Sequence, residues 1–193
     1  MNKDAKREDL KQRLITAAED QIREHGLGGL KARAVTAQAG CALGALYNAV
    51  EDLDMLVLHV NSKTLARLGQ ELAQAVRPDM TAKAALLALA HAYVAFATQN
   101  ERLWIALFEH RLPEGRDIPD WHKQDHEQLI AQINGPLSQL VPGLSGDQLS
   151  MRGRTLFAAV QGVVHLSFKG RFVGVPREHL QSEVAALVTA LVG

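Results

Sequence analysis

Four side chains near the amino end are suited to contact nucleic acid: Lys31, Arg33, Tyr47 and Asn48. An asparagine amide can pair with a base edge or a phosphate, and lysine and arginine neutralise phosphates. The segment RAVTAQAGCALGALY, residues 33–47, carries two of these four side chains, and Lys31 and Asn48 lie just outside its two ends. Its spacing predicts two short helices joined by a tight turn, an arrangement typical of DNA-binding proteins.

The position of Gly40 predicts where the two helices that hold these residues end and begin. Residues 33–39 supply the first helix, Gly40 and Cys41 the turn, and residues 43–47 begin the second. Gly40 stands where the chain must reverse, because glycine enters the left-handed conformation without steric cost. In a helix-turn-helix the second helix enters the major groove. The residues that we predict to contact DNA are Lys31, Arg33, Ala42, Leu43, Ala45, Tyr47 and Asn48.

The same stretch resembles the TetR family of repressors. The family pattern joins A-A-x-x-x-(I/F)-x-x-x-G to an (I/V)-A-x-x-A-G-V-S-x-G-x-(L/I)-Y helix-turn-helix. The matching residues here are Leu14–Ala18, Gly26, Arg33–Val35, Ala39–Gly40 and Gly44–Tyr47. The resemblance implies that Tyr47 reaches a phosphate and that a DNA-binding head precedes a larger helical body.

The chain departs from this family at several positions that usually carry polar or aromatic side chains. They are Ala42, Ala45, Ala49, Val50 and Leu53. Residues 1–55 hold eight Lys or Arg and nine Asp or Glu, a net charge of −1, whereas attraction to phosphate favours a basic surface. The alternative function is therefore a ligand-binding or protein-interaction dimer that keeps the fold but has weakened or lost sequence-specific DNA recognition.

Aromatic and histidine side chains gather between residues 91 and 126. Rings with a few polar tips suit a pocket for a small apolar or aromatic molecule, although core packing is the alternative for any single residue. The resemblance implies an effector cavity in this part of the chain. The residues that we predict to bind the effector are His91, Phe96, Trp104, Phe108, Trp121 and His122.

No cofactor and no enzyme activity is expected. His122 and His126 are four residues apart with Asp125 beside them, a spacing that can hold a metal. However, Lys123 follows the first histidine, so the zinc-protease pattern H-E-x-x-H is absent and we expect no metal site. No nucleophile has a plausible base, and no glycine-rich phosphate loop follows a strand.

Composition and periodicity predict an all-α protein of about nine helices. Hydrophobic residues make up 47% of the 193 and aromatic residues 5%, which favours a core of Leu, Ala and Val. We expect a three-helix DNA-binding domain over residues 1–51 and a helical effector-binding and dimerisation domain over residues 52–193. The predicted helices outside the helix-turn-helix are Lys6–Glu24, a long helix capped by Asp52 and ending near Val76, Thr81–Gln99, Glu101–His110, Trp121–Ile133, Asp147–Lys169 and Pro176–Leu191.

The last two predicted helices carry apolar stripes that could pair with a second copy as a four-helix bundle. Gly162 lies in the middle of one, where a glycine usually indicates that another backbone comes close. The resemblance implies dimerisation at these helices, and Phe157-x-x-x-Gln161-Gly162 looks like a variant of a Trp-x-x-x-His-Gly signature in one group of the family. The predicted interface residues are Phe157, Val160, Gly162, Val164, Leu180, Val184, Leu187 and Val188.

The expected compartment is the cytoplasm. Cys41 is the single cysteine, so an intrachain disulfide is excluded and a reducing compartment is natural. The charged amino end lacks the apolar core of a signal peptide, and the most apolar segment, residues 84–97, is too short to span a bilayer. The sequence as a whole predicts a homodimeric, ligand-responsive transcriptional repressor whose partners are an operator in duplex DNA and a small-molecule effector.

Overall fold

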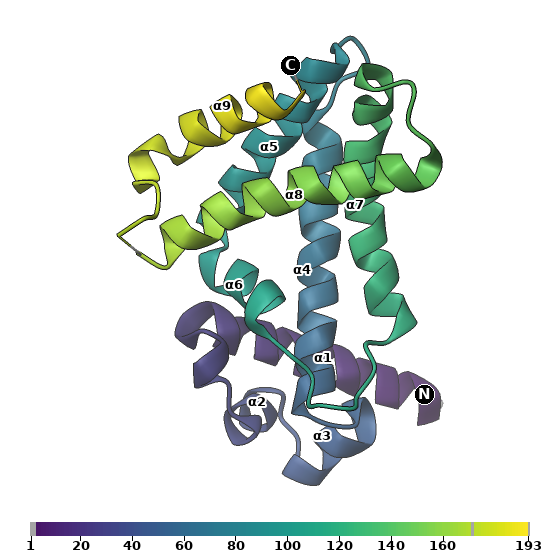
Figure 1. Ribbon diagram of the computed structural model, residues 1–193. Coiled ribbons are helices and arrows are strands. Elements are labelled where there is room, and N and C mark those ends of the chain that lie inside the picture. Colours follow the sequence, from purple (N-terminus) through teal and green to yellow (C-terminus); the bar gives the residue numbers. More distant parts are fainter. Residues whose placement is uncertain (1–2, 171, 193) are drawn as a thin grey trace. The chain divides into compact units, whose positions relative to one another are not determined.

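The computed structural model describes residues 3–170 and 172–192, and over these ranges it contains nine α-helices and no strand (Figure 1). The predicted all-α class and helix number are confirmed. No helix within the described ranges is both long and apolar enough to cross a membrane. The helices are α1 (Lys3–His25), α2 (Ala32–Gln38), α3 (Leu43–Val50), α4 (Leu53–Ala75), α5 (Ala82–Gln99), α6 (Glu101–Glu109), α7 (Asp120–Leu140), α8 (Gly146–Phe168) and α9 (Leu180–Val192).

Contacts divide the chain into two compact units. The first comprises residues 1–64 and 102–122, and the second comprises residues 65–101 and 123–193. The first unit therefore combines the amino-terminal helices with most of α6, the segment that follows it and the first residues of α7. The long helix α4 contributes its first half to one unit and its second half to the other.

The core of the first unit is built from apolar residues at helical spacing. On α1, the fully buried side chains include Leu14, Ala18 and Ile22, which recur every four residues and so share one face. Val35 of α2 and Leu46 of α3 are also fully buried in this cluster. These residues place α1, α2 and α3 around one shared core.

Two polar contacts join other helices of the first unit. Glu19 of α1 is 4% exposed, and its carboxylate lies 2.6 Å from the Lys63 ammonium of α4 and 2.6 Å from the Arg23 guanidinium. Arg102 of α6 donates to the Glu24 carbonyl at the carboxyl end of α1, where a helix leaves carbonyls without an internal partner. These contacts fix α1 against α4 and α6.

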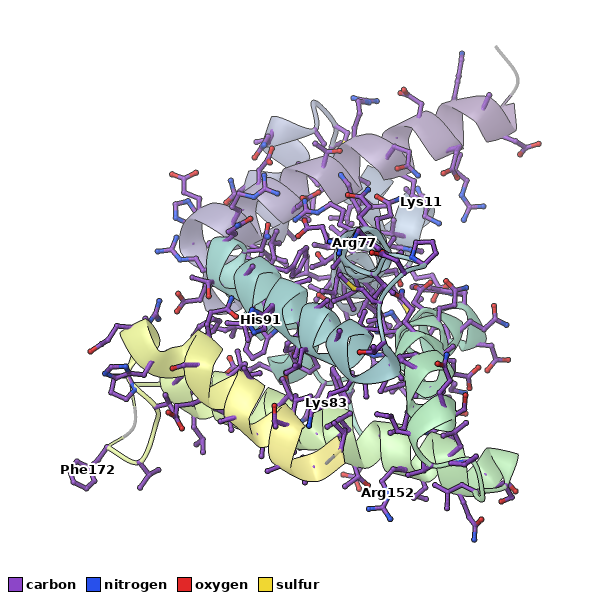
Figure 2. All side chains as sticks on the ribbon, turned by 90° about the horizontal axis from the view of Figure 1, so that it is seen from above. Lys11, Arg77, Lys83, His91, Arg152 and Phe172 are labelled. Atoms are coloured by element: carbon purple, nitrogen blue, oxygen red, sulfur yellow. The ribbon has the colours of Figure 1, made fainter. Side chains whose placement is uncertain are left out.

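In the second unit α9 packs on α5 and α8, and α8 also contacts α5 (Figure 1). Thr81 caps α5 by accepting a hydrogen bond from the Ala84 amide at 3.2 Å. Ser145 caps α8 in a capping box with Gln148. Phe172, in the segment between α8 and α9, is fully exposed and extends away from the helices (Figure 2).

The prediction that residues 134–136 close the seventh helix is wrong. The helix continues through Pro136 to Leu140, although an interior proline removes a backbone hydrogen bond and costs roughly 3 kcal/mol. Leu129 before the proline and Leu137 after it are both buried. The apolar face therefore continues past the proline, and its packing offsets the lost hydrogen bond.

The close approach expected at Gly162 is not found within this chain. A Cβ atom placed on Gly162 would meet nothing within 4 Å. It is Gly153, two and a half turns earlier on α8, that lies against another element, because a Cβ there would collide with the Asn134 side chain of α7. The close contact thus involves α7 and a different glycine.

Candidate DNA-contacting and effector-binding sites

The turn between α2 and α3 has the geometry that the sequence predicts. Gly40 has a φ of 67°, in the left-handed region that residues with a Cβ avoid. The Cys41 amide donates to the Thr36 carbonyl at 3.0 Å, and Thr36 is itself buried. The turn is therefore held by backbone bonds to a fixed helix, so it sets the direction in which α3 leaves.

Helix α3 has one buried and one exposed face. Leu46, Ala49 and Val50 are at most 7% exposed, whereas Leu43 is 37% and Tyr47 50% exposed. Leu43 and Tyr47 are four residues apart and so lie on the same face. Ala49 and Val50, two of the departures from the family pattern, are core residues and are not available to DNA. The outward face of α3 therefore presents Leu43 and Tyr47 to solvent.

The remaining predicted DNA contacts also lie in the first unit. Lys31, Arg33, Ala42 and Asn48 are exposed, and Ala45 is partly buried. Ala42 occupies the N-cap position of α3 and provides no side-chain hydrogen bond there. The first turn of α3 therefore has no side-chain cap, and the Ala45 amide donates to the Ala42 carbonyl at 2.9 Å.

Three carboxylates follow α3, and two of them pair with Arg116, a partner that no spacing in the sequence indicated. Glu51 has a φ of 69°, and Asp52 caps α4 by accepting a hydrogen bond from the Met55 amide at 2.8 Å, as predicted. Arg116, between α6 and α7, forms an ion pair with Asp52 and lies 3.3 Å from the Glu51 carboxylate. Burial raises the pKa of Asp52, but the bonds from Met55 and Arg116 outweigh it and lower that pKa.

A histidine stands beside the third of these carboxylates. The His110 ring lies 3.7 Å from the Asp54 carboxylate. Burial lowers the pKa of His110, and the neighbouring Asp54 charge opposes that shift. His110 and Arg116, both in the segment that follows α6, therefore each contact the corner between α3 and α4.

Four of the six predicted effector residues lie in the first unit, where each has a partner. Trp104 is fully buried and packs on Phe108, with 5.0 Å between ring centroids. Trp121 stacks on His59 at 4.6 Å and 7° between planes. The other predicted residue, His122, is 2.8 Å from the Ser62 hydroxyl. These side chains form the packing of the first unit.

The other two, His91 and Phe96, belong to the second unit. Phe96 is fully buried, with the Arg67 guanidinium 5.9 Å from its ring centroid. His91 is exposed on α5 (Figure 2), and its backbone carbonyl accepts a hydrogen bond from Gln181. The six side chains are therefore not brought together at one site.

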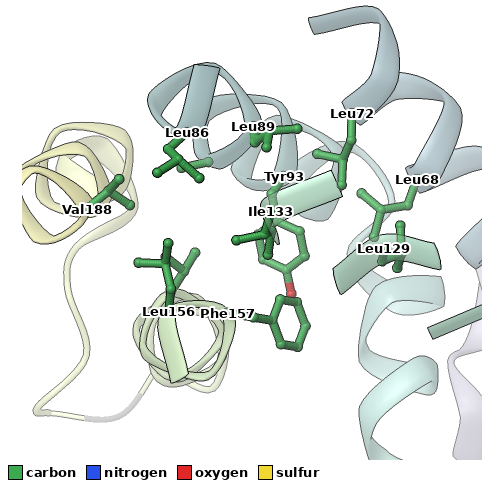
Figure 3. A pocket seen from close by; sticks show the side chains of 12 residues that line it. Leu68, Leu72, Leu86, Leu89, Tyr93, Leu129, Ile133, Leu156, Phe157 and Val188 are labelled. Atoms are coloured by element: carbon green, nitrogen blue, oxygen red, sulfur yellow. The ribbon is translucent and has the colours of Figure 1, made fainter. Parts of the chain in front are cut away.

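A cavity of about 50 Å³ lies inside the second unit and is lined by other residues (Figure 3). Helices α4, α5, α7, α8 and α9 all contribute to its wall. Most lining side chains are aliphatic, and none of the six predicted effector residues is among them. The residues that line it are Leu68, Leu72, Leu86, Leu89, Ala90, Tyr93, Leu129, Ile133, Leu156, Phe157, Val160 and Val188.

Most of the predicted interface residues are covered by the chain's own helices. Val160, Val164, Leu180, Val184 and Val188 are at most 6% exposed. Phe157 and Leu187 are partly buried, and Gly162 is exposed. The apolar stripes of α8 and α9 face the core of their own unit, which the sequence pattern alone did not distinguish from an intermolecular face. The outward side of α8 instead carries Met151, 65% exposed, and Leu166, 40% exposed.

His122 and His126 are not part of a metal-binding cluster in the described residues, which contain no group of three or more His, Cys, Asp or Glu placed to hold an ion. Burial lowers the pKa of His126, against the opposing charge of Asp125. Asp125 also lines a groove of about 340 Å³ on α4 and α7 that contains three glutamines.

Comparison with models of known protein families identifies the family of this chain. Residues 86–191, more than half of the chain, match the model of the tetracyclin repressor-like C-terminal domain. The chain belongs to the TetR family. Members of this family are transcriptional regulators, and a comparison of this TetR-family chain with curated proteins finds no match.

Solved structures share the TetR-family fold. A TetR transcriptional regulator from Rhodococcus sp. RHA1 has a TM-score of 0.69 and 15% identity, covering 97% of each chain. RolR in complex with resorcinol has a TM-score of 0.74 and 19% identity, over 99% of this chain and 91% of that one. FadR from Bacillus subtilis in complex with stearoyl-CoA has a TM-score of 0.72 and 14% identity, over 94% and 97%. At these sequence identities, the comparison establishes a shared fold and nothing about function.

Proposed function

We propose that this TetR-family chain is a DNA-binding transcriptional repressor that acts as a homodimer and is released from its operator by a small molecule. The observation that carries the proposal is the outward face of α3, where Tyr47 is 50% and Leu43 37% exposed beside the exposed Asn48. Leu43 and Tyr47 are four residues apart and share one face of α3, so DNA whose major groove holds α3 would cover both.

On DNA, α3 would lie in the major groove. Asn48 would reach a base edge or a phosphate, and Tyr47 a phosphate. Leu43, Ala42 and Ala45 offer methyl groups, which fit the C5-methyl group of thymine but provide no hydrogen bonds. Lys31 and Arg33 would hold the sugar-phosphate backbone beside the groove. This set of side chains favours A/T-containing operators.

The effector would bind in the cavity of the second unit. The related folds of RolR and FadR hold resorcinol and stearoyl-CoA respectively, which supports a small-molecule role for this chain. A ligand changes DNA affinity only if it binds one conformation of the protein better than another. The cavity walls come from five helices, so a ligand that enlarges the cavity must displace at least some of them.

A second copy would cover the outward faces of α8 and α9. Met151 and Leu166 are exposed on α8, and the exposed Gly162 lies between them with no atom near its Cβ position. Small and apolar groups on one helical face permit close packing against the same face of a partner. A dimer would carry two copies of α3 to successive major grooves, so the spacing of the operator half-sites matters.

Titration of the purified chain with DNA from upstream of its own gene tests this function. Arg33→Gln should weaken binding and lower the slope of log affinity against log salt by about one, because one phosphate contact is lost. The matched control is Arg77→Gln, which removes an exposed arginine of the second unit. Tyr47→Phe should also weaken binding without changing the free energy of unfolding. Equal effects of the two arginine changes would contradict the proposal.

A second function is favoured by the charges beside α3. Glu51, Asp52 and Asp54 follow α3 directly, and the head as a whole carries a net charge of −1. These charges favour a dimer of TetR fold that binds ligands or proteins and no longer recognises an operator. Such a protein would bind the upstream fragment no better than random DNA of equal length.

A further inference from the structure

We propose that Arg13 of α1 is a positioning residue for DNA binding, which holds the carboxyl end of α2 and so fixes the turn that leads into α3. This inference rests on the proposed function and adds to it a residue that lies outside both helices of the helix-turn-helix. It depends on the bond from Arg13 to the end of α2, on the contacts that orient the Arg13 side chain, and on the short connection between α2 and α3.

Arg13 caps the carboxyl end of α2 from a neighbouring helix. Inside the turn the backbone provides some of the bonds itself, as the Cys41 amide does by donating to the Thr36 carbonyl at 3.0 Å. Ala39, the C-cap residue of α2, is 5% exposed, and its carbonyl accepts a hydrogen bond from the Arg13 guanidinium. A positive charge at this end of a helix is also favourable, because the last carbonyls carry a partial negative charge.

The Arg13 side chain lies over the turn in a defined orientation. Asp9, one turn earlier on α1, accepts a hydrogen bond from the Arg13 Nε atom at 3.1 Å. A Cβ atom placed on Gly40 would lie 3.7 Å from the Arg13 Nη1 atom, so the guanidinium lies beside the glycine where the chain reverses. The planar guanidinium makes both hydrogen bonds at once because its donors point in fixed, different directions.

Other polar contacts attach the same end of α2 to α1, beside which it packs (Figure 1). The Gln38 side chain donates to the Asp20 carboxylate at 2.9 Å and accepts from the Gln21 amide at 3.2 Å. Asp20 is seven residues after Arg13, about two helical turns further along α1. The end of α2 is thus restrained at two places. Only residues 39–42 join it to α3, so this restraint also limits the directions in which α3 can leave.

A direct contact between Arg13 and a DNA phosphate is the competing role. Arg13 lines an open groove of about 300 Å³ between α1 and α2, and 49% of its side chain is exposed. The two roles differ in their dependence on salt. Loss of a phosphate contact lowers the slope of log affinity against log salt by about one and weakens binding to all sequences equally. A turn that is held less firmly weakens mainly the sequence-specific complex, in which α3 must fit the groove.

Titration of Arg13→Gln with the upstream DNA fragment, and with random duplex DNA of equal length, separates these roles. We expect affinity for the upstream fragment to fall about two- to tenfold, the effect of one lost hydrogen bond, and affinity for random DNA to stay within about twofold. The salt slope should not change. Arg13→Lys keeps a donor but not the planar fork, so it should recover part of the loss. Equal weakening on both DNAs, with a salt slope lower by about one, would overturn the positioning role.

Hydrogen exchange of the chain without DNA tests whether Arg13 holds the turn. The Cys41 amide should exchange about two- to tenfold faster in Arg13→Gln, because the turn opens more often. The Asn100 amide, bonded to the end of α5 in the second unit, should keep its rate, because its opening leaves the Arg13 bond intact. Arg7→Gln removes the same charge from an exposed position of α1 and should change neither rate. An unchanged Cys41 rate in Arg13→Gln would overturn the inference.

The two experiments separate this inference from the proposed function. If the unmodified chain binds the upstream fragment no better than random DNA, the proposed function is refuted and the DNA role of Arg13 with it, while the exchange rates still establish whether Arg13 holds the turn. If the unmodified chain prefers the fragment and Arg13→Gln binds it equally well, the proposed function stands and the positioning role is overturned.

Discussion

The guanidinium of Arg116 is paired with the carboxylate of Asp52, sixty-four residues earlier in the chain. Asp52 is also the N-cap of α4, and it stands two residues after the end of α3. A side chain from the segment after α6 therefore contacts the residue that joins the proposed DNA-contacting helix to the next one. Arg116 is placed to fix the angle at which α3 leaves this corner.

Replacing Arg116 should weaken DNA binding without direct loss of a DNA contact. In Arg116→Gln the pairing with Asp52 and Glu51 is lost, and α3 becomes less firmly oriented. Couplings of this kind change affinity by roughly two- to thirtyfold, and we expect a loss in that range when the upstream fragment is titrated. The pKa of Asp52 should rise toward its ordinary value, because Arg116 helps to lower it.

Arg116→Lys is the matched control for this change. Lysine keeps the positive charge but cannot bridge two carboxylates with a planar fork, so an intermediate affinity is expected. Tighter DNA binding by Arg116→Gln would refute the orienting role of Arg116. It would also show that repulsion between DNA and the carboxylates at this corner, which the change increases, does not dominate.

Stability should fall on mild acidification because of His59. Burial lowers the pKa of His59 from 6.5 to about 4, and the Lys11 charge adds to the shift while Glu8 opposes it. Between these two values the unfolded chain takes up a proton that the folded chain does not, so the free energy of unfolding decreases as the pH falls from 6.5 to 4.

His59→Phe keeps a ring against Trp121 and removes the titration. Denaturant unfolding at several pH values should then show a flatter dependence over this interval than the unmodified chain does. His179→Gln, at an exposed histidine, is the comparison. Identical pH dependence in the unmodified chain and His59→Phe would exclude His59 as the source.

The two glycines of α8 should respond in opposite ways to alanine. Gly153→Ala places a methyl group into the Asn134 side chain, and overpacking of this kind costs about 1–3 kcal/mol. Gly162→Ala meets nothing within 4 Å in its own chain and replaces a poor helix former, so the free energy of unfolding of the separate chain should rise by up to about 1 kcal/mol. Chemical denaturation of both variants measures the difference, and a destabilised Gly162→Ala would reveal a neighbour that the single chain lacks.

Dimer formation should depend on the outward face of α8. Gly162→Arg adds a long charged side chain at an exposed position, where it need not disturb the core of its own unit. We expect light scattering after gel filtration to give the mass of one chain for this variant and of two chains for the unmodified protein. Gln12→Arg, at an exposed position of α1, should not alter the mass.

Much of the fold could be predicted because local signals agree with the final packing. Gly40 and Asp52 mark a turn and a helix start by their own backbone and side-chain chemistry, and both have the predicted geometry. Pro136 misled the prediction because its local preference is outweighed by packing on either side, which no local pattern reports.

The candidate sites were less accessible from the sequence. Trp104 and Phe96 have the residue types of a ligand pocket, but both are fully buried, and the cavity lies among leucines that resemble any helical core. The pairing of Arg116 with Asp52 joins distant residues, and no spacing in the sequence indicates it. An amphipathic helix such as α9 also reveals that one face is buried without revealing whether its own chain or a second copy covers it.

Both tryptophans of the chain, Trp104 and Trp121, lie in the first unit, whereas the cavity belongs entirely to the second. Trp121 is stacked on a histidine of α4, a contact that alters indole emission when it is loosened. Tryptophan emission, excited so that Tyr93 of the cavity wall does not contribute, is therefore blind to occupation of the cavity itself and reports only what reaches the other half of the molecule. A change in that emission when a ligand fills the cavity would be, without any label, a measure of communication between the two.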